Sequence, residues 1–423
     1  MSLKQLKMKN QRTLNKNKGL IMYYFKQRSK LQSSVTKTNA SFSVCGTLFF
    51  ILALTLFSCI KEPLAPKPVK VQDTIKQTKP DTSKQTTIDT IKRIKTATTY
   101  NKGIYILNEG LNNQNNASLS FYSLKDSIAQ TDYFDIINGR KLGDLGNDIK
   151  IYGGKVYIVV SISSQVEVLD LLTGKSIKQI PIFNSIKPRQ VRKIAFCKNK
   201  AFVCSFDGTV EVIDTASLQI ENIIKVGRNP DGIAVVGNKI YVANSGGLDN
   251  PNYDKTVSVI DFATLTETKR IPVQINPTYM NTDKYGNVYV VSRGNYTDVK
   301  MRLQIIDSKT DSVTKLFTEF EALNLAIKGD TAYVYCYDFT GATGSTILLL
   351  NVTNQSIIRK NFITDNTKIE TVYGIAVHPT TGDVFITDAH AYTKTGEVFC
   401  FTAAGKKKYS FKVGLLPSCM VFF

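Results

Sequence analysis

The sequence of 423 residues has no tryptophan and only two histidines, His378 and His390. It also lacks a GxSxG elbow and a phosphate-binding loop, so the common signatures of serine hydrolases and nucleotide-binding enzymes are missing. The two histidines are not spaced as a metal-binding pair, and we predict no metal site and no cofactor. His378 lies in a turn-like HPTTGD segment, which leaves His390, in DAHAY, as the better candidate for ligand contact.

Long apolar segments are scarce as well. The main one runs from Val44 to Phe57 and is too short to span a bilayer comfortably. Residues 1–58 carry ten Lys or Arg and no Asp or Glu, and Ser58 is followed by Cys59. This pattern resembles a bacterial lipoprotein signal, in which a small residue precedes the cysteine that is acylated. It predicts a signal peptide over residues 1–58 and lipidation of Cys59; an uncleaved anchor helix is the alternative.

Residues 59–99 are rich in Lys, Thr, Pro and Gln and poor in apolar residues. Such a segment cannot bury enough surface to offset its ordering entropy, so it predicts a disordered tether, which as a flexible coil reaches roughly 35 Å on average. We therefore expect a lipid-anchored protein of the cell envelope, in the outer membrane. Lys61-Glu62 resembles the charged signals that direct some lipoproteins outward, and display on the cell surface is a further expectation.

The net charge of +20 is concentrated near the N-terminus. Without residues 1–99, 35 Lys or Arg and 30 Asp or Glu remain, so residues 100–423 carry only +5. No basic stretch in that part is interleaved with aromatic residues in a recognised module, and we predict no nucleic-acid partner. The basic tether suits a lipid surface instead.

Residues 100–423 contain an odd number of cysteines, all on or beside predicted strands, so at least one thiol is free. Two of them flank a hairpin turn at unequal offsets and are not expected to face each other. We interpret all of them as small core residues without a disulfide. They are Cys197, Cys204, Cys336, Cys400 and Cys419.

Short β-strand patterns are abundant. Gly232–Val236 is apolar and β-branched, Gly237-Asn238 suits a tight hairpin turn, and Lys239–Ala243 is the return strand. A third strand, Thr256–Ile260, and a fourth within Thr264–Val273 complete the unit. Four antiparallel strands in about 45 residues have the size of one propeller blade.

The second strand of this unit recurs seven times, each copy with an aromatic anchor. The anchors are Tyr105, Tyr157, Phe202, Tyr241, Tyr289, Tyr333 and Phe385. They are separated by 52, 45, 39, 48, 44 and 52 residues, close to the period of four-stranded blades. Because one blade cannot bury both faces alone, the repeats predict an all-β, seven-bladed β-propeller over residues 100–423. A β-sandwich with chance similarity is the alternative.

The ends of the repeat region complement each other. Gly414–Phe423 resembles a first strand with no second strand after it, whereas the first copy, near Gly103, has no first strand before it. We predict that the terminal strand completes the first blade and closes the ring, which leaves no open sheet edge.

The NPDGIAV, KIYVAN and VSVID segments of the fourth copy resemble the YVTN (YncE-like) seven-bladed propellers, and the resemblance covers about residues 101–423. It implies the fold strongly and the function weakly, because such propellers serve as binding modules, surface proteins and enzymes. Lipid-anchored propellers of this kind capture cobalamin. By that resemblance we expect a non-enzymatic protein that captures a bulky polar nutrient, such as a corrinoid or a glycan, for an outer-membrane transporter.

The loops between second and third strands are long in the fourth to seventh copies and in the first, which are neighbours in a closed ring. They offer amides, hydroxyls and flat aromatic surfaces. We predict that they form a ligand-binding rim beside the loops that lead into each first strand. The candidate residues are Asn108, Glu109, Asn244, Tyr253, Tyr279, Arg293, Tyr296, Asp338, Tyr373, His390 and Tyr392.

Two other functions stay open at this point. The same loops can form a protein-binding scaffold or an adhesion surface. Alternatively, Glu109, Asp338 and Asp388 gather near the axis as the calcium or acid–base cluster of a propeller lactonase or lyase. Their spacing carries no motif, and carboxylates at loop starts commonly cap turns. We therefore assign no catalytic residue.

Overall fold

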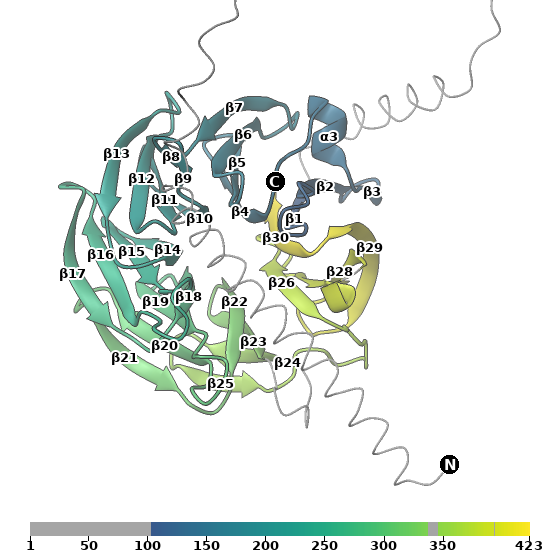
Figure 1. Ribbon diagram of the computed structural model, residues 1–423. Helices are drawn as coiled ribbons and strands as arrows, with labels where there is room; N and C mark the ends of the chain where they lie inside the picture. Colours follow the sequence, from purple (N-terminus) through teal and green to yellow (C-terminus); the bar gives the residue numbers. More distant parts are fainter. Residues whose placement is uncertain (1–102, 337–345, 393) are drawn as a thin grey trace, which may run out of the picture.

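The computed structural model describes residues 103–336, 346–392 and 394–423. Its main strands form seven four-stranded antiparallel sheets, which surround a central axis as the blades of a propeller (Figure 1). This arrangement confirms the predicted all-β class, the blade number and the four strands in each blade. The predicted signal peptide, Cys59 and the tether lie outside the described residues.

The first three blades are numbered in chain order. Blade 1 consists of β1 (Gly103–Asn108), β2 (Ser118–Ser123), β3 (Ile128–Gln130) and the last strand, β30 (Pro417–Phe422). Blade 2 consists of β4 (Gly146–Tyr152), β5 (Lys155–Val160), β6 (Gln165–Asp170) and β7 (Ser176–Pro181). Blade 3 consists of β10 (Val191–Cys197), β11 (Lys200–Ser205), β12 (Thr209–Asp214) and β13 (Ile220–Lys225).

The other four blades follow the same order from the axis outward. Blade 4 consists of β14 (Pro230–Val236), β15 (Lys239–Asn244), β16 (Thr256–Asp261) and β17 (Thr266–Pro272). Blade 5 consists of β18 (Pro277–Thr282), β19 (Asn287–Ser292), β20 (Arg302–Asp307) and β21 (Ser312–Phe317). Blade 6 consists of β22 (Ala322–Lys328), β23 (Thr331–Cys336), β24 (Thr346–Asn351) and β25 (Ser356–Arg359). Blade 7 consists of β26 (Val372–Val377), β27 (Val384–Asp388), β28 (Thr395–Phe401) and β29 (Lys407–Leu415).

The second strands are apolar at nearly every position because both of their faces are buried between blades. In β15, Ile240 and Val242 pack with Phe202 of blade 3, whereas Tyr241 packs with Met280 of blade 5. Successive side chains of a strand point to opposite faces, so one strand fills two interblade cores. All seven aromatic anchors are buried in this way, as the repeat pattern predicts.

The ring closes through the pairing of β30 with β1, which confirms the predicted role of the C-terminal strand. Gly103 and Phe423 exchange two backbone hydrogen bonds, of 2.8 and 3.1 Å, and the Phe423 ring stacks on Tyr105 at 4.7 Å between ring centroids. Figure 1 shows the C-terminus beside β1, at the inner edge of the blade. The first and last described segments therefore share one sheet.

Two elements were not expected from the sequence. A short helix, α3 (Tyr133–Asn138), follows the three-residue strand β3 and buries Tyr133 and Phe134 against the first blade. A small hairpin, β8 (Phe183–Asn184) with β9 (Lys187–Pro188), lies between blades 2 and 3. Neither segment has enough residues for a periodic pattern to identify it.

All five cysteines between residues 103 and 423 are unpaired; four are buried and Cys419 is half-buried. This agrees with the interpretation that they form no disulfide. None of the helices in the described ranges has the length and apolar character that crossing a membrane requires.

Glu211 of β12 provides a pH-dependent element of stability. Its carboxylate is buried and accepts hydrogen bonds from Ser205 Oγ (2.6 Å) and Thr209 Oγ1 (2.8 Å). Burial raises the pKa of Glu211, so the folded state holds this proton more tightly than the unfolded state does. Its contribution to stability is therefore fully present below the ordinary glutamate pKa and is lost as the pH rises through the folded-state value.

We expect Glu211→Gln to change the pH dependence of unfolding. The free energy of unfolding of the wild type minus that of the variant should decrease from pH 4 to pH 7, since only the wild type carries this titration. Urea titrations of both proteins at matched pH values measure the difference, and other titrating groups cancel. A difference that stays constant or increases with pH would contradict the prediction.

Candidate functional site

A cavity of about 360 Å³ lies on the propeller axis. Innermost strands of all seven blades contribute to its wall, together with the loops at the end where the second strands stop. The cavity thus extends from this loop face into the space between the innermost strands.

One ring of the cavity wall arises from a repeated irregularity of the backbone. Each innermost strand has a register shift next to its second residue, where an extra residue stands against the neighbouring strand. Such a β-bulge bends the strand and redirects a side chain. The residues at this position all line the cavity, and we call them the bulge ring: Asn147, Arg192, Asp231, Thr278, Leu323, Tyr373 and Ser418.

Side chains of the bulge ring contact their neighbours around the axis. Arg192 Nε lies 2.8 Å from Asp231 Oδ1 on the next blade, and both side chains are largely buried. The Arg192 guanidinium also lies over the Phe206 ring, 4.3 Å from its centroid. Arg293 Nε donates to Thr278 Oγ1 at 3.3 Å. These contacts hold the polar side chains at the cavity wall in fixed positions.

Two edge-to-face tyrosine pairs form the aromatic part of the wall. Tyr253 and Tyr296 come from the long loops of blades 4 and 5, with ring centroids 6.1 Å apart and planes at 76°. Tyr373 and Tyr392 of blade 7 are 6.0 Å apart at the same angle. The Tyr373 hydroxyl donates to the carboxylate of Glu109, which follows β1. The pairs present ring surfaces together with hydroxyl groups.

Tyr253 has an unusual position. Its side chain is 9% exposed, and among the residues that the structure describes its hydroxyl has no hydrogen-bond partner. Burial, with a smaller effect from Tyr296, raises the pKa of this hydroxyl to about 12. The group therefore stays protonated, and an unpaired buried hydroxyl costs stability until a partner satisfies it.

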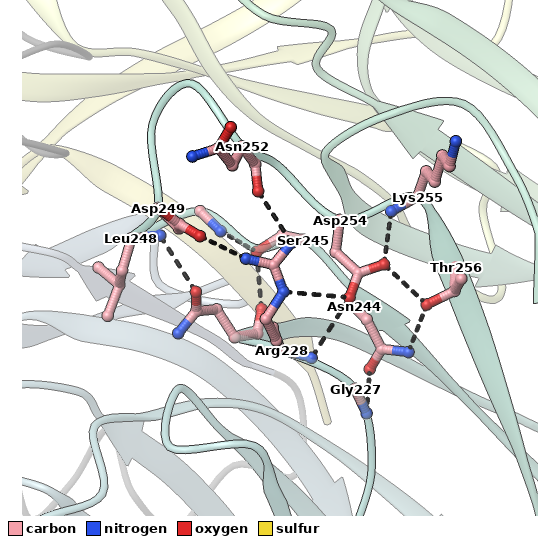
Figure 2. A network of polar contacts seen from close by, with 12 residues as sticks. Gly227, Arg228, Asn244, Ser245, Leu248, Asp249, Asn252, Asp254, Lys255 and Thr256 are labelled. Carbon is pink, nitrogen blue, oxygen red and sulfur yellow. Dashed lines mark hydrogen bonds and ion pairs between the residues drawn. The ribbon is translucent and has the colours of Figure 1, made fainter.

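The loop that carries Tyr253 is held by a polar network (Figure 2). Arg228 Nη1 lies 2.5 Å from Asp249 Oδ2, and its Nη2 donates to the carbonyl oxygen of Asn252 at 2.8 Å. Arg228 precedes the innermost strand of blade 4, whereas the other two residues lie between its second and third strands. The network joins the two loops that meet at the loop face.

Asn108 and Asn244 were predicted to contact a ligand, but the structure places both inside their own blades. Both are fully buried, and neither lines the cavity. Asn244 Nδ2 donates to Thr256 Oγ1 (3.0 Å) and Ser258 Oγ (2.9 Å), as Figure 2 shows in part. Asn108 Nδ2 makes the corresponding bonds to Ser118 Oγ and Ser120 Oγ, at 3.0 and 2.9 Å. These amides hold second and third strands together where the strands separate into loops.

His390 also lies away from the cavity wall. Its ring nitrogens are 3.5 to 3.6 Å from carboxylate oxygens of Glu370, Asp388 and Glu397. Asp388 is engaged by the backbone N–H groups of residues 370, 371 and 390, and Glu397 pairs with Lys412. Accordingly, residues 103–336, 346–392 and 394–423 contain no group of His, Cys, Asp and Glu placed to hold a metal ion.

The structure gathers most of the other predicted residues at the cavity. Of the predicted acidic cluster, Glu109 lines the cavity and Asp388 does not. Asp338 and Cys59 lie outside the described residues. Tyr279 and Tyr373 lie near the starts of β18 and β26, not on the loops that precede them. The predicted residues that line the cavity are Glu109, Tyr253, Tyr279, Arg293, Tyr296, Tyr373 and Tyr392.

The bulge ring, apart from Tyr373, was missed from the sequence. Its members share a backbone position and not a residue type. A faint signal exists before them: residues in the left-handed conformation precede several first strands, as at Asn229 (φ 44°) and Asn276 (φ 60°) in the Asn-Pro steps. An alignment of the repeats on the Asn-Pro dipeptide puts Asp231 and Thr278 at the same position of their first strands.

The cavity wall carries both signs of charge. Its cations are Lys150, Arg192, Lys193 and Arg293, and its carboxylates are Glu109, Asp148 and Asp231. The Asp148 carboxylate raises the pKa of Lys150, so this lysine is charged at neutral pH. A site of this kind can bind a polar molecule by hydrogen bonds, charge and ring contacts together.

Comparison with solved structures supports the fold. The chain is similar to hydrazine synthase from Kuenenia stuttgartiensis, with a TM-score of 0.51 and 17% identity over 60% of this chain and 76% of that one. It is also similar to a quinonprotein alcohol dehydrogenase-like protein from Bacteroides thetaiotaomicron, with a TM-score of 0.58 and 16% identity over 76% of this chain and 78% of that one. At such identities the likeness shows the propeller fold alone, and the resemblance to YVTN propellers stays a prediction.

Comparison with curated proteins gives no match. A family model, in contrast, covers the whole propeller from the start of β1 to the last residue. Residues 102–423 match the domain of unknown function DUF5074, and the chain belongs to this family.

Proposed function

We propose that the axial cavity binds an organic ligand with a flat face and polar edges, without covalent chemistry. Tyr253 carries this proposal, because its side chain lines the cavity and its buried hydroxyl has no partner among the described residues. A ligand that accepts this hydrogen bond removes the cost of the unpaired group. The two tyrosine pairs offer ring surfaces on which such a ligand can stack.

The entry point of the chain suits a tethered binding protein. β1 begins at Gly103 and runs toward Glu109 at the cavity, so the preceding chain joins the head at the face opposite the loop face. The predicted lipid anchor and flexible tether would then leave the loop face, with its cavity, clear of the attachment point. We propose a lipoprotein of the outer membrane that presents its ligand outward, for transfer to a transporter.

The size of the cavity limits the ligand. About 360 Å³ falls at the lower end of the range for small-molecule sites. A compact ligand fits within the cavity, whereas a corrinoid is larger and would enter only in part, with its remainder over the loops. We therefore propose a screen of corrinoids, glycans and small aromatic compounds by thermal unfolding of the full chain, since ligands that bind only the folded state raise its stability.

Tyr253→Phe tests the site once a ligand is found. The variant should keep or slightly raise the stability of the free protein, because it removes an unpaired buried hydroxyl, and it should weaken ligand binding by about 1 kcal/mol, or about fivefold. Calorimetric titration measures the affinity, and urea unfolding measures the stability.

Tyr289→Phe is the matched control. Tyr289 is fully buried outside the cavity wall, and its hydroxyl donates to Asp283 Oδ2 at 3.2 Å. This variant should lose stability and leave ligand affinity unchanged. If Tyr253→Phe instead destabilises the protein without weakening binding, the hydroxyl belongs to the fold and not to the site.

A further inference from the structure

A second tier of residues lies directly below the bulge ring. It is formed by the next residue of each innermost strand: Asp148, Lys193, Gly232, Tyr279, Asn324, Gly374 and Cys419. Its side chains other than the glycines line the cavity, as does Lys150, two residues further along β4. Together with Lys150, this tier carries two ammonium groups and one carboxylate, whereas the bulge ring carries one guanidinium and one carboxylate, Arg192 and Asp231.

One carboxylate in the second tier faces two ammonium groups. Lys150 Nζ is 3.4 Å from Asp148 Oδ1, and the Asp148 oxygens also accept the backbone N–H groups of residues 149 (3.0 Å) and 194 (3.1 Å). Lys193 Nζ donates to the carbonyl oxygen of Asn147 at 2.5 Å. Asp148 can compensate only one of the two lysine charges, so this part of the cavity carries an excess positive charge.

The two lysines are accessible from the cavity. The Lys150 side chain is 49% exposed although its strand is the innermost of blade 2, so the exposed part faces the axis. An ammonium group has three N–H donors, and the Asn147 carbonyl uses one donor of Lys193. Across the axis, burial raises the pKa of the Tyr279 hydroxyl, while the charges of Lys150 and Lys193 oppose the rise. Tyr279 lines the same cavity as Lys150 and Lys193, so its hydroxyl and the two ammonium groups border one space.

We propose that Lys150, Lys193 and Tyr279 form an oxyanion subsite, which binds a carboxylate or phosphate group of the cavity ligand. The inference rests on the proposed function and adds to it the chemical class of the ligand. The oxyanion compensates the excess charge and accepts hydrogen bonds from the ammonium and hydroxyl donors. The rest of the ligand then extends past the bulge ring to the tyrosine pairs.

Cys419 allows the charge of the second tier to be measured without knowing the ligand. Its sulfur is 3.9 Å from the Asn147 carbonyl oxygen, the same atom that Lys193 contacts, and it is half-buried while the other four described cysteines are buried. The full chain is treated with an anionic and a cationic methanethiosulfonate reagent, and modification of Cys419 is followed by peptide mass spectrometry. Relative to a simple thiol, the anionic reagent should be favoured about tenfold.

Variants assign the preference to the two lysines. Lys150→Met with Lys193→Met should abolish the preference for the anionic reagent. The control is Lys175→Met with Lys225→Met, two exposed lysines on the outer side of the blades, which should leave it unchanged. Equal rates for both reagents in the wild type, a preference that persists in the first variant, or no reaction of Cys419 with either reagent would each overturn the inference.

Protection by simple anions separates this inference from the proposed function. Inorganic phosphate and benzoate should slow the modification of Cys419 in the wild type and not in the lysine variant, whereas benzamide at the same concentration should have no effect on either. A neutral ligand whose affinity depends on the tyrosines but does not change in the Lys150→Met, Lys193→Met variant would contradict the oxyanion subsite and leave the proposed function intact. If simple anions protect Cys419 but Tyr253→Phe does not change the affinity of a larger ligand, the oxyanion subsite is supported and the proposed role of Tyr253 is contradicted.

Discussion

Val421→Pro should open the propeller ring and cost the protein about 3 kcal/mol or more of its free energy of unfolding. Gly103 and Phe423 form a hydrogen-bonded pair between β1 and β30, so by the alternation of an antiparallel ladder Val421 also exchanges hydrogen bonds with its partner Tyr105. Proline removes one of these bonds and disturbs the packing of Phe422 and Phe423 against blades 7 and 1. Urea unfolding of the variant and the wild type measures the loss.

The control for ring closure is Ile358→Pro on β25, the outermost strand of blade 6. Ile358 is 53% exposed and belongs to a strand of four residues at the outer edge of its sheet. Its substitution should cost clearly less than that of Val421. Deletion of residues 417–423 extends the test, since it removes a whole strand with one buried and several half-buried apolar side chains and should prevent stable folding. A deletion variant that unfolds as cooperatively as the wild type would show that β30 is dispensable.

Asp231→Ala should destabilise the protein by about 3 to 5 kcal/mol, because it leaves the Arg192 charge buried without its carboxylate. The two atoms of this pair are 2.8 Å apart, and the side chains are 5% exposed for Arg192 and 14% for Asp231. The guanidinium retains Phe206 and the weaker contact with Ser161 Oγ at 3.5 Å, which cannot neutralise it. Urea unfolding at pH 7 gives the loss.

Asp249→Ala provides the matched control on the same face. Its partner Arg228 lies only 2.5 Å away, yet the two side chains are 51% and 53% exposed, so water screens the pair and the loss should stay below about 1 kcal/mol. Replacing both buried partners, as Arg192→Met with Asp231→Leu, should recover much of the stability lost in Asp231→Ala. Equal losses for Asp231→Ala and Asp249→Ala would show that burial does not decide the strength of the pair.

The architecture could be predicted from the sequence because each blade repeats one buried strand. Tyr241 and its equivalents recur at spacings of 39 to 52 residues, since every second strand packs on both sides and needs a large apolar residue at that place. Closure could be predicted because Gly414–Phe423 resembles a first strand but has no second strand after it. Helix α3 and the β8–β9 hairpin were not predicted, because a six-residue helix and two-residue strands are too short to show a hydrophobic periodicity.

The candidate site could be predicted only in part. Tyr253, Tyr296 and Tyr392 were found because long loops interrupt the repeat, and a departure from a repeat is visible in sequence. Asn244 was predicted at the ligand-binding rim but lies inside blade 4. The sequence alone does not distinguish an amide at a loop start that faces a ligand from one that faces its own blade. The Thr256 and Ser258 hydroxyls two residues apart, which mirror Ser118 and Ser120, were the available signal.

The bulge ring could not be predicted from residue types. Arg192, Asp231 and Leu323 have no chemistry in common, and what they share is the extra residue that shifts each innermost strand against its neighbour. A one-residue shift is a property of backbone pairing, which leaves no mark on composition or on hydrophobic alternation.

The pairing of β1 with β30 also sets an order of events during synthesis. Blades 2 to 7 are each built from consecutive segments, so they can form while the chain is still emerging, but blade 1 needs the last residues to be made. Bringing the two ends together requires closing the longest loop in the molecule, and contacts between distant residues slow folding. We expect ring closure to be the slow step, during which the bare edge of β1 is exposed to mispairing with other nascent chains.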